Sequence, residues 1–491
     1  MDRSAGILLP VSALPSPYGI GTLGRAAYEF ADFLAAAGQR VWQVLPVGPI
    51  GYGDSPYSSC STFAGNPYYV DLDLLADEGL LDRAELQREW WGESARSVDY
   101  GRIYELRFTY LRKALDNTCG RLDGELDRFA AENRWLPDYA LFMAIKRQQG
   151  MKPWTEWPEG LRLRESAALD RARWELREDI RLFTFIQYEF YKQWDALRAC
   201  LREKDIRLVG DLPIYAASDS ADVWSEPQFF QLDERNLPER VAGVPPDYFS
   251  ADGQLWGNPL YRWDVMRADG FGWWIRRLEG MRRLFDVVRI DHFRGFESYW
   301  SVPAGEPTAR NGRWEKGPGM ELVGVLRDWF YDFPIIAEDL GVMTDEVREL
   351  LHDSGFPGMK VLEFAFDPSA LSEYLPHHHR RNCVCYVGTH DNETLVQWFR
   401  ETDPAVLAFA REYLGLNEQE GLCRGMIRAG MSSVADLFVV QLQDWLELGA
   451  AARMNKPGTA LGNWRWRVLP EELTEELAVR IRRLTQICAR I

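Results

Sequence analysis

Short apolar runs recur along the whole chain, and each is followed by polar or Gly/Pro-rich residues and then by helical periodicity. Eight such runs predict β-strands at 6–10, 41–46, 206–213, 286–292, 334–341, 359–366, 383–391 and 437–444. Strands that are apolar almost throughout are typical of a parallel sheet that is covered on both faces. Eight of them alternating with helices predict an α/β fold, a (β/α)8 TIM barrel.

The spacing between the predicted strands is uneven, which locates insertions. A mainly helical insertion is expected at 57–205, between strands two and three, and an aromatic, loop-rich one at 214–284, between strands three and four. A further insertion is expected at 296–333, between strands four and five. Long loops inside a compact domain are more often functional than idle. We therefore expect a single catalytic barrel domain over 1–491, with subdomains around its active-site face.

Ionisable side chains follow the apolar runs at the ends where a barrel gathers its catalytic groups. In "FDVVRIDHFRGF" (285–296), the apolar Val287 and Val288 lead directly to Arg289, with Asp291 and His292 following. The carboxylates at the ends of the other runs are Asp211, Glu338, Asp339 and Asp391. Charged groups are rarely buried unless they are paired or functional. Their coincidence at one end of several strands therefore indicates a site that needs acids.

Cleavage of a glycosidic bond needs two carboxyl groups in different charge states. One attacks the anomeric carbon, and the other, protonated, gives its proton to the leaving oxygen, at a separation of about 5–5.5 Å in retaining enzymes. Arg289 and Asp291 are two residues apart, so both side chains point to one face and the cation favours ionised Asp291. Glu338 follows an apolar run, where burial and nearby carboxylates favour its protonated form.

Several segments carry a resemblance to a known family. "RIDHFRG" (289–295), "IIAEDLG" (335–341) and "YVGTHDN" (386–392), in this order, resemble segments of the α-amylase-type glycosidases. The whole chain more narrowly resembles the amylomaltases, the 4-α-glucanotransferases also called disproportionating enzymes. The narrower resemblance rests on "LPVGPIGYGDSPYSSCSTFAGNPYYVDL", "GDLPIYAASDSADVW", "GVPPDYFSADGQLWGNPLYRW" and "NKPGTALGNWRWR".

The resemblance implies roles for individual residues. Asp291 would be the nucleophile, Glu338 the general acid/base, and Asp391 a third carboxylate that grips sugar hydroxyls and favours ring distortion. The substrate-binding residues that it implies are Tyr57, Asp211, Tyr248, Phe249, Trp256, Arg289, His292, His390, Asn463 and Trp464. After "THDN" the chain reads "ETL" (393–395), where relatives tend towards Asp-Thr-Thr, so the contacts of this loop are expected to differ.

The activity implied by the resemblance is transfer of an α-1,4-glucan segment, through Asp291, to the 4-hydroxyl of glucose or another glucan. The partners would be glucan donors and glucose or maltooligosaccharide acceptors, with no cofactor and no metal. Water at roughly 55 M competes with an acceptor at about 1 mM, so transfer needs discrimination of order 10⁵, or about 7 kcal/mol. Aromatic loops that exclude water could supply it. The alternatives are an α-amylase-type hydrolase and a non-catalytic glucan-binding protein.

Composition narrows the possible partners and the compartment. The net charge of −17 argues against nucleic acid or an anionic membrane surface, because both need a basic face. Seven cysteines, an odd and sparse set, do not form a disulfide framework. No run approaches the ~18 apolar residues of a membrane span, and prolines interrupt the apolar start too early for a signal peptide. A cytoplasmic protein, monomeric or weakly oligomeric, is expected.

Three further patterns have structural interpretations. "GIGTLG" (19–24) matches the dinucleotide-binding spacing, but the next strand carries no acid to bind a ribose. Loop glycines entering a helix explain it better, and a dinucleotide oxidoreductase is the weakest alternative. The histidines at 377–379 are interpreted as a solvated loop, and the cysteines at 383 and 385 as buried thiols, rather than as metal ligands.

Overall fold

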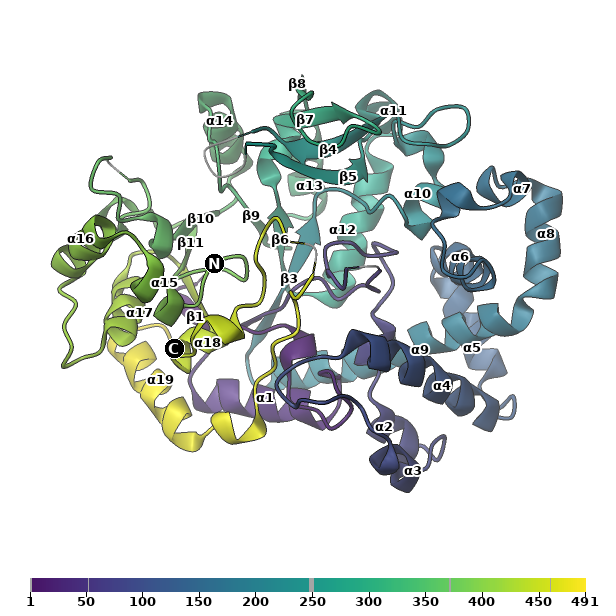
Figure 1. Cartoon of the computed structure of the whole chain (residues 1–491), viewed down its shortest axis with the longest axis horizontal. Helices are drawn as coiled ribbons and strands as arrows, with labels where there is room; N and C mark the ends of the chain where they lie inside the picture. The colour runs from purple at the N-terminus through teal and green to yellow at the C-terminus, as the bar shows by residue number, and fades with distance from the viewer. Residues whose placement is uncertain (1, 52, 247–250, 371, 460) are drawn as a thin grey trace.

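Eight parallel strands form the central sheet of the computed structural model, which describes residues 2–51, 53–246, 251–370, 372–459 and 461–491 (Figure 1). Their spatial order is β10-β11-β12-β1-β2-β3-β6-β9. The strands are β1 (Ser4–Leu8), β2 (Val41–Gln43), β3 (Arg207–Pro213), β6 (Val287–Asp291), β9 (Ile335–Ala337), β10 (Gly358–Val361), β11 (Cys383–Tyr386) and β12 (Leu437–Gln441). Between β9 and β10, the Ala337 N–H donates to the Pro357 carbonyl at 2.9 Å. The sheet is therefore a nearly closed barrel.

All eight predicted strands are present, which confirms the TIM barrel, but most of them end earlier than predicted. β9 ends at Ala337, so Glu338 is the first residue beyond it, and β11 ends at Tyr386, five residues before Asp391. The loop that follows β11 is itself buried, with Val387 fully inaccessible. Hydrophobicity therefore continues past the point where strand pairing stops, and the apolar pattern overestimates strand length.

Alternate strand residues fill the barrel interior. Side chains from all eight strands form one buried cluster, made of Leu8, Val41, Val209, Val287, Ile336, Met359, Val361, Val384, Tyr386, Leu437 and Val439. Branched side chains of this kind suit a packed, pleated surface. Successive strand residues alternate between the two faces of the sheet. Asp211 is two residues after Val209 on β3, and Arg289 and Asp291 are two and four residues after Val287 on β6, so all three point into the barrel.

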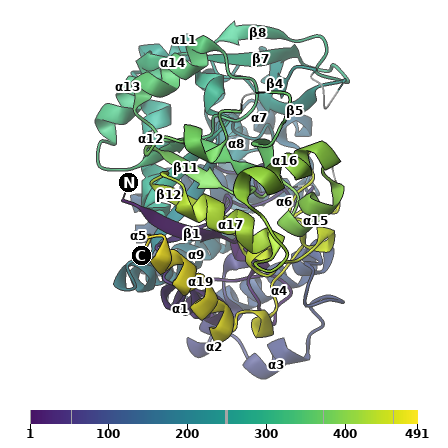
Figure 2. The ribbon, with the colours of Figure 1, turned by 90° about the vertical axis from the view of Figure 1, so that its left-hand side faces the viewer.

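Helices cover the outside of the barrel (Figures 1 and 2). They include α1 (Arg25–Ala36), α9 (Arg177–Glu203), α12 (Gly272–Leu284), α13 (Met320–Trp329), α14 (Asp345–Ser354), α15 (Leu395–Glu401), α16 (Pro404–Leu414), α17 (Leu422–Ser432), α18 (Leu442–Trp445) and α19 (Glu475–Ile487). α19 shows why such segments are helical. Its N-cap Thr474 accepts the Leu477 N–H, and it buries Leu477, Ile481 and Leu484 at helical spacing against α1 and α17.

A helical region precedes β3 and lies to the right in Figure 1. It comprises α2 (Leu72–Asp77), α3 (Arg83–Arg88), α4 (Tyr100–Asn117), α5 (Asp123–Glu132), α6 (Leu136–Gln148), α7 (Glu159–Arg162) and α8 (Ser166–Glu175), several of which pack on the long α9. Between β3 and β6 lie α10 (Ala221–Ser225) and α11 (Trp263–Ala268).

A small antiparallel sheet, at the top of Figure 1, was not predicted from the sequence. Its order is β5-β4-β7-β8, with β4 (Arg240–Val244), β5 (Gln254–Pro259), β7 (Ser298–Pro303) and β8 (Arg313–Lys316). The strands come from two segments of the chain on either side of β6. β8 is mostly exposed and the β4–β5 register is irregular, so neither gives a clear alternating pattern.

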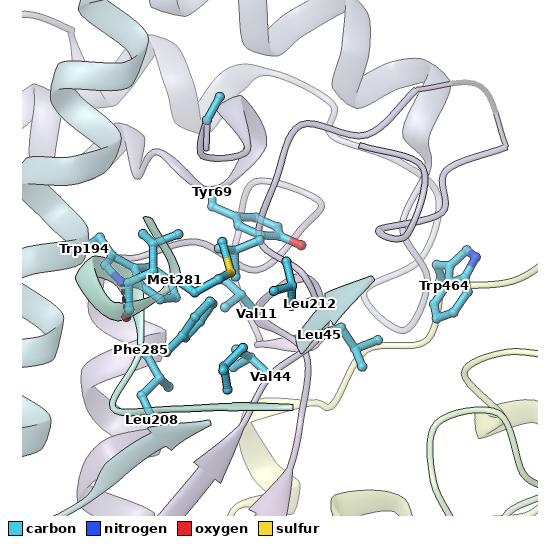
Figure 3. Close-up of a cluster of buried hydrophobic side chains, with 14 of the residues drawn as sticks. Val11, Val44, Leu45, Tyr69, Trp194, Leu208, Leu212, Met281, Phe285 and Trp464 are labelled. Atoms are coloured by element: carbon cyan, nitrogen blue, oxygen red, sulfur yellow. Dashed lines mark hydrogen bonds between the residues drawn. The ribbon is translucent and has the colours of Figure 1, made fainter. Parts of the chain in front are cut away.

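The main core connects the barrel with the helical region. Figure 3 shows part of it, where Leu208 of β3, Trp194 of α9 and Phe285 after α12 pack together. The rings of Trp194 and Phe285 meet edge to face at 5.8 Å. Elsewhere in this core Cys383 and Cys385 are buried free thiols, as predicted. Within the ranges described, no helix is long and apolar enough to cross a membrane.

Candidate active site

Arg289 lies at the centre of the site, at the top of the barrel interior. Its Nη1 donates to both carboxylate oxygens of Asp211, at 2.7 and 2.6 Å, and its Nη2 lies 2.9 Å from Asp291 Oδ1. The Arg289 and Asp211 side chains are only 4% and 0% exposed. Two carboxylates from neighbouring strands therefore share one buried cation, and the predicted contact between Arg289 and Asp291 is present.

One cation does not neutralise the carboxyl groups around it. Burial raises the pKa of Asp291 well above its usual range, and Asp211 and Glu338 raise it further, whereas Arg289 opposes the shift. Burial also raises the pKa of Glu338, as expected, against Arg289 and two backbone N–H groups. The rise at Asp291 differs from the prediction of a readily ionised carboxylate, because the guanidinium also serves Asp211. The cluster therefore favours retention of a proton.

Glu338 follows β9 directly and lies against the backbone of the neighbouring strand. Its Oε2 accepts the His292 N–H at 2.8 Å, and its Oε1 accepts the Leu340 N–H at 2.6 Å. The Glu338 N–H in turn donates to the Ile290 carbonyl at 3.0 Å. Glu338 is thus one hydrogen bond from the backbone that follows Asp291, and its carboxyl group contacts backbone amides.

Asp391 lies on the loop after β11 and is the most exposed of the carboxylates, at 44% for its side chain. The Asn455 amide donates to its Oδ1 at 2.6 Å, and its Oδ2 lies 3.4 Å from His390 Nε2. Burial lowers the pKa of His390. The neutral imidazole then carries one N–H. We assign its proton to Nε2, because the oxygens of Tyr57 and Asp391 lie 2.9 and 3.4 Å from that nitrogen.

Tyr57 connects the two sides of the site. Its hydroxyl donates to Asp211 Oδ2 at 2.6 Å and lies 2.9 Å from His390 Nε2. The Tyr57 ring stacks on His390, with centroids 5.3 Å apart and planes at 16°, and lies 5.9 Å from Trp464. The buried ion pair and the Asp391 loop are therefore held in fixed relation by one phenol.

A cleft of about 460 Å³ opens above these groups. Its lining includes Gly53, Ser55, Tyr57, Ser58, Pro213, Ile214, Tyr215, Gln254, Trp256, Asn258, Asp291, His292, Asp391, Asn455, Pro457, Gly458, Thr459, Asn463 and Trp464. The volume lies within the range of ligand sites, and the lining combines aromatic rings with a few hydrogen-bonding groups. Such a surface suits a ligand that has apolar faces and hydroxyl edges.

The other predicted binding residues fall into three groups. Trp256 of β5 and His292 meet edge to face at 4.8 Å on the cleft wall, and the Trp256 side chain is 38% exposed. Asn463 lines the cleft, but its amide also binds Thr459 and accepts the Lys456 N–H, so it holds its own loop. The predicted residues Tyr248 and Phe249 lie outside the described ranges.

Two residues at the site were missed by sequence reasoning. Asn455 binds Asp391 directly, and Arg453 donates to the Asp391 carbonyl at 2.8 Å and to Glu393 Oε1 at 2.6 Å. Both lie at or just before the segment "NKPGTALGNWRWR", from which the resemblance implies only Asn463 and Trp464 as binding residues. A partly buried polar side chain that approaches from a distant part of the chain leaves no periodic signal.

The weaker patterns have local roles. The glycines at 19–24 precede α1, where a methyl group on Gly24 would lie 2.1 Å from the Asp71 carboxylate. The imidazoles of His377, His378 and His379 each hydrogen-bond a nearby oxygen, at 2.7–2.9 Å. In the described part of the chain, no group of three or more His, Cys, Asp or Glu side chains could hold a metal ion.

The sequence and the fold of the whole chain resemble those of known proteins. The family model described as 4-alpha-glucanotransferase matches residues 9–473. The chain is 48% identical to the 4-alpha-glucanotransferase of Thermus thermophilus over 503 residues, covering 100% of each protein. It is 47% identical to that of Clostridium butyricum over 483 residues, covering 98% of this chain and 99% of the relative. The structure superposes on amylomaltase from Streptococcus agalactiae in complex with acarbose with a TM-score of 0.97, at 40% identity and 99% coverage of both chains. The chain therefore belongs to the 4-alpha-glucanotransferase family.

Proposed function

We propose that this family member transfers α-1,4-glucan segments with retention of configuration, using Asp291 as nucleophile, Glu338 as general acid/base and Asp391 as third carboxylate. One observation carries the assignment. Asp291 and Asp391 line the same cleft, and Glu338 is hydrogen-bonded to the peptide that follows Asp291. Two of the three carboxyl groups therefore face one space and the third lies one hydrogen bond behind it, which supports the assignment of a single sugar linkage to that space.

In the first half-reaction, the Asp291 carboxylate attacks the anomeric carbon of the donor. The C–O bond to the leaving glucan breaks, and Glu338 gives its proton to the departing 4-oxygen. The carboxyl cluster retains a proton, and we place it on Glu338, because Arg289 contacts Asp291 directly at 2.9 Å and opposes the rise that burial causes in the pKa of Asp291. Because both Glu338 oxygens accept backbone N–H groups in the substrate-free structure, we expect its side chain to rotate towards the leaving oxygen when a glucan is bound.

In the second half-reaction, the 4-hydroxyl of an acceptor glucan attacks the same anomeric carbon. Its proton passes to the Glu338 carboxylate, the ester bond to Asp291 breaks, and the transferred segment leaves with its α-configuration restored. Asp391, held by Asn455, would accept hydrogen bonds from hydroxyls of the distorted ring. No redox or group-carrier chemistry is required, so we propose that the reaction needs no cofactor.

Preference for glucan over water is assigned in part to the aromatic wall of the cleft. Trp256 offers a ring that is 38% exposed, and the neighbouring rings of Tyr57 and Trp464 line the same cleft. At this exposure, a sugar stacked on Trp256 buries well under the ~150–250 Å² of a whole aromatic side chain, a contact worth roughly 2 kcal/mol at ~25 cal/mol per Å². Ring contacts therefore supply part of the discrimination against water, and hydrogen bonds between acceptor hydroxyls and cleft residues would supply the rest.

The experiment is incubation of the protein with maltotriose and analysis of product lengths over time. Transfer predicts glucose together with maltopentaose and longer oligosaccharides. Glucose and maltose without longer products would assign an α-amylase-type hydrolase. A Glu338→Gln variant that matches the wild type in rate would reject the acid/base assignment, and wild-type binding without turnover would identify a glucan-binding protein.

We further propose that 1–491 acts as one catalytic barrel, with the insertions at 57–205, 214–284 and 296–333 shaping the cleft. Trp256 comes from the second of these segments and Tyr57 from the first, which supports such a role. We also propose that the protein is cytoplasmic and is a monomer or a weak oligomer. The seven free cysteines fit a reducing compartment.

A further inference from the structure

Three consecutive residues of a distant segment hold the turn at 389–393, which carries His390 and Asp391. These residues are Arg453, Met454 and Asn455, named here the 453–455 strap. The backbone at Arg453 is extended, with φ −61° and ψ 131°, and side chains alternate along an extended segment. Met454 is 1% exposed and belongs to the main core. The side chains of Arg453 and Asn455 instead reach the turn.

The strap is anchored on the side away from the turn. Besides the burial of the Met454 side chain, the Met454 carbonyl accepts the Trp464 N–H at 2.7 Å. The Trp464 carbonyl in turn accepts a hydrogen bond of 2.8 Å from the hydroxyl of Tyr100, a buried residue of α4. The strap is thereby tied to the core and to the loop that carries Trp464. It is a fixed support against which the turn can be held.

Hydrogen bonds join the strap to the turn along its length. The Asn455 N–H donates to the His390 carbonyl at 3.1 Å, and the Asn455 amide donates to Asp391 Oδ1 at 2.6 Å. Arg453 Nη2 donates to the Asp391 carbonyl at 2.8 Å, and its Nη1 donates to Glu393 Oε1 at 2.6 Å. Both the backbone and the carboxylate of Asp391 are therefore bound to the strap.

Each nitrogen of the Arg453 guanidinium has a different acceptor. In addition to the two contacts of the Nη atoms with the turn, Nε donates to the Asn455 carbonyl at 2.8 Å. The side chain is 15% exposed. A planar guanidinium can serve three acceptors in a fixed fork, whereas a lysine has a single nitrogen. Arg453 therefore fixes both partners of the hydrogen bond between Asn455 and Asp391.

The Asp391 carboxylate depends on such support. Its side chain is 44% exposed and lines the cleft, so packing does not fix its direction. A functional side chain without locked packing is oriented by the hydrogen bonds behind it. Displacement of a positioned group by about 1 Å can cost about 100-fold in rate. Loss of the Arg453 contacts would therefore be expressed in the reaction more than in the binding of substrate.

We propose that Arg453 is a positioning residue, whose guanidinium holds the turn at 389–393 and Asn455 together so that the Asp391 carboxylate faces the cleft. The inference rests on the proposed role of Asp391. Glu393 gives the guanidinium its counter-charge, with Nη1 and Oε1 2.6 Å apart. This contact assigns a function to position 393, where the chain departs from the aspartate towards which relatives tend.

The first test is substitution of Arg453 and of its counter-ion. Arg453→Lys keeps the charge but cannot hold the carbonyls of Asp391 and Asn455 as well as Glu393. Its kcat on maltotriose should fall about 10- to 100-fold, with KM within about threefold of wild type. Glu393→Ala removes one of the three acceptors and should lower kcat about 3- to 10-fold. Glu393→Gln keeps an acceptor oxygen and should stay within about twofold.

Arg164→Lys is the matched control. Arg164 lies in the helical region, its side chain is 19% exposed, and its Nη2 donates to Asp138 at 2.7 Å. It is thus a partly buried arginine with an acidic partner, like Arg453, but away from the cleft. Its kcat should stay within about twofold of wild type. Thermal midpoints identify a temperature at which every variant is folded, and all rates are measured there.

A double variant separates positioning from a general structural role. In an Asp391→Asn background, Arg453→Lys should lower kcat further by no more than about threefold, because the carboxylate that it positions is gone. Full multiplication of the two losses would show that Arg453 acts independently of Asp391 and would overturn the proposal. Wild-type kcat in the Arg453→Lys single variant would overturn it as well.

Hydrogen exchange of the ligand-free protein gives a readout that does not depend on glucan transfer. Arg453→Lys should speed exchange of the amides in 388–395 by at least about tenfold, whereas Arg164→Lys should leave it unchanged. Equal exchange in the wild type and Arg453→Lys would contradict the proposed support of the turn. A wild type that transfers no glucan, together with faster exchange in Arg453→Lys, would instead reject the proposed function.

Discussion

The barrel interior has two layers that differ in chemistry although the same strands build them. In the lower layer, Val209, Val287 and Ile336 are at most 1% exposed and belong to one apolar cluster. Two residues further along β3 and β6, the upper layer holds Asp211 and Arg289, which are equally inaccessible but charged. Burial is common to both layers, so burial alone does not explain the upper one.

The energetic contrast indicates what each layer is for. Burying a valine or leucine side chain contributes about 1.5–3 kcal/mol to folding, and the contribution is not directional. A buried ion pair is often no better for stability than an apolar pair of the same volume. The upper layer therefore costs stability, or at best leaves it unchanged, and its carboxylates are explained by the chemistry at the cleft.

The largest expected effect comes from removing the nucleophile. Asp291→Asn should lower the transfer rate by about 10⁴- to 10⁶-fold, because the covalent step is lost. The same change removes one of several mutually repelling carboxyl groups, so the thermal midpoint should stay the same or rise. Initial rates on maltotriose and thermal unfolding, measured on one preparation, check both halves. A destabilised but active variant would reverse the contrast between the layers.

Arg289→Met tests the buried cation. It leaves Asp211 buried without its charge partner, which should cost about 3–5 kcal/mol in the free energy of unfolding by urea. The double variant Asp211→Asn with Arg289→Met should recover much of this stability, since the fully buried Asp211 charge is gone and Asp291, whose side chain is 31% exposed, can stay protonated, but it should recover no activity. Equal stability of the single variant and the wild type would show that the ion pair is not buried in solution.

Leu437→Ala probes the lower layer. Leu437 of β12 is fully buried in the apolar barrel cluster, and truncation should cost about 2–5 kcal/mol of unfolding free energy. At a temperature where the variant is folded, kcat should stay within about twofold of wild type, because no group at the cleft is changed. A large loss of kcat with unchanged stability would contradict the division into layers.

At neutral pH the smallest effect is expected at His292. Burial lowers its pKa to about 3, and its backbone φ of 55° is tolerated by asparagine. The folded protein binds fewer protons than the unfolded chain between pH 6.5 and 3, so stability falls as the pH drops through this window. His292→Asn should show a weaker fall in its thermal midpoint there, and the same midpoint as wild type at pH 8. Parallel curves would mean that His292 is protonated in the folded state.

The barrel could be predicted because each strand buries both faces and so produces a continuous apolar run. The same period of two residues places Arg289 beside Asp291, and strand order places Glu338 next to them. The antiparallel sheet could not be predicted, since β8 is mostly exposed, β4 and β5 pair irregularly, and the two pairs of strands are separated in sequence by all of β6.

Other contacts at the site join residues that are far apart in the sequence, and such contacts leave no pattern in the local sequence. Asn455 reaches Asp391 across 64 residues of sequence, and Asp444 reaches Leu395 across 49. From the sequence, the run at 393–395 stands out only as a departure from the pattern of relatives. The structure gives it contacts, since Glu393 pairs with Arg453 and the Leu395 N–H binds Asp444.

The most direct test of the central claim is to trap the glycosyl-enzyme. The Glu338→Gln variant should react with α-maltosyl fluoride, because the fluoride leaving group needs no acid. The covalent glycosyl-enzyme should then accumulate, because the base for the second step is missing. Peptide mass spectrometry should find one maltosyl group on the peptide containing Asp291, and addition of maltose should slowly remove it as a longer oligosaccharide. An adduct on another carboxylate, or turnover of the fluoride without any adduct, would contradict the account.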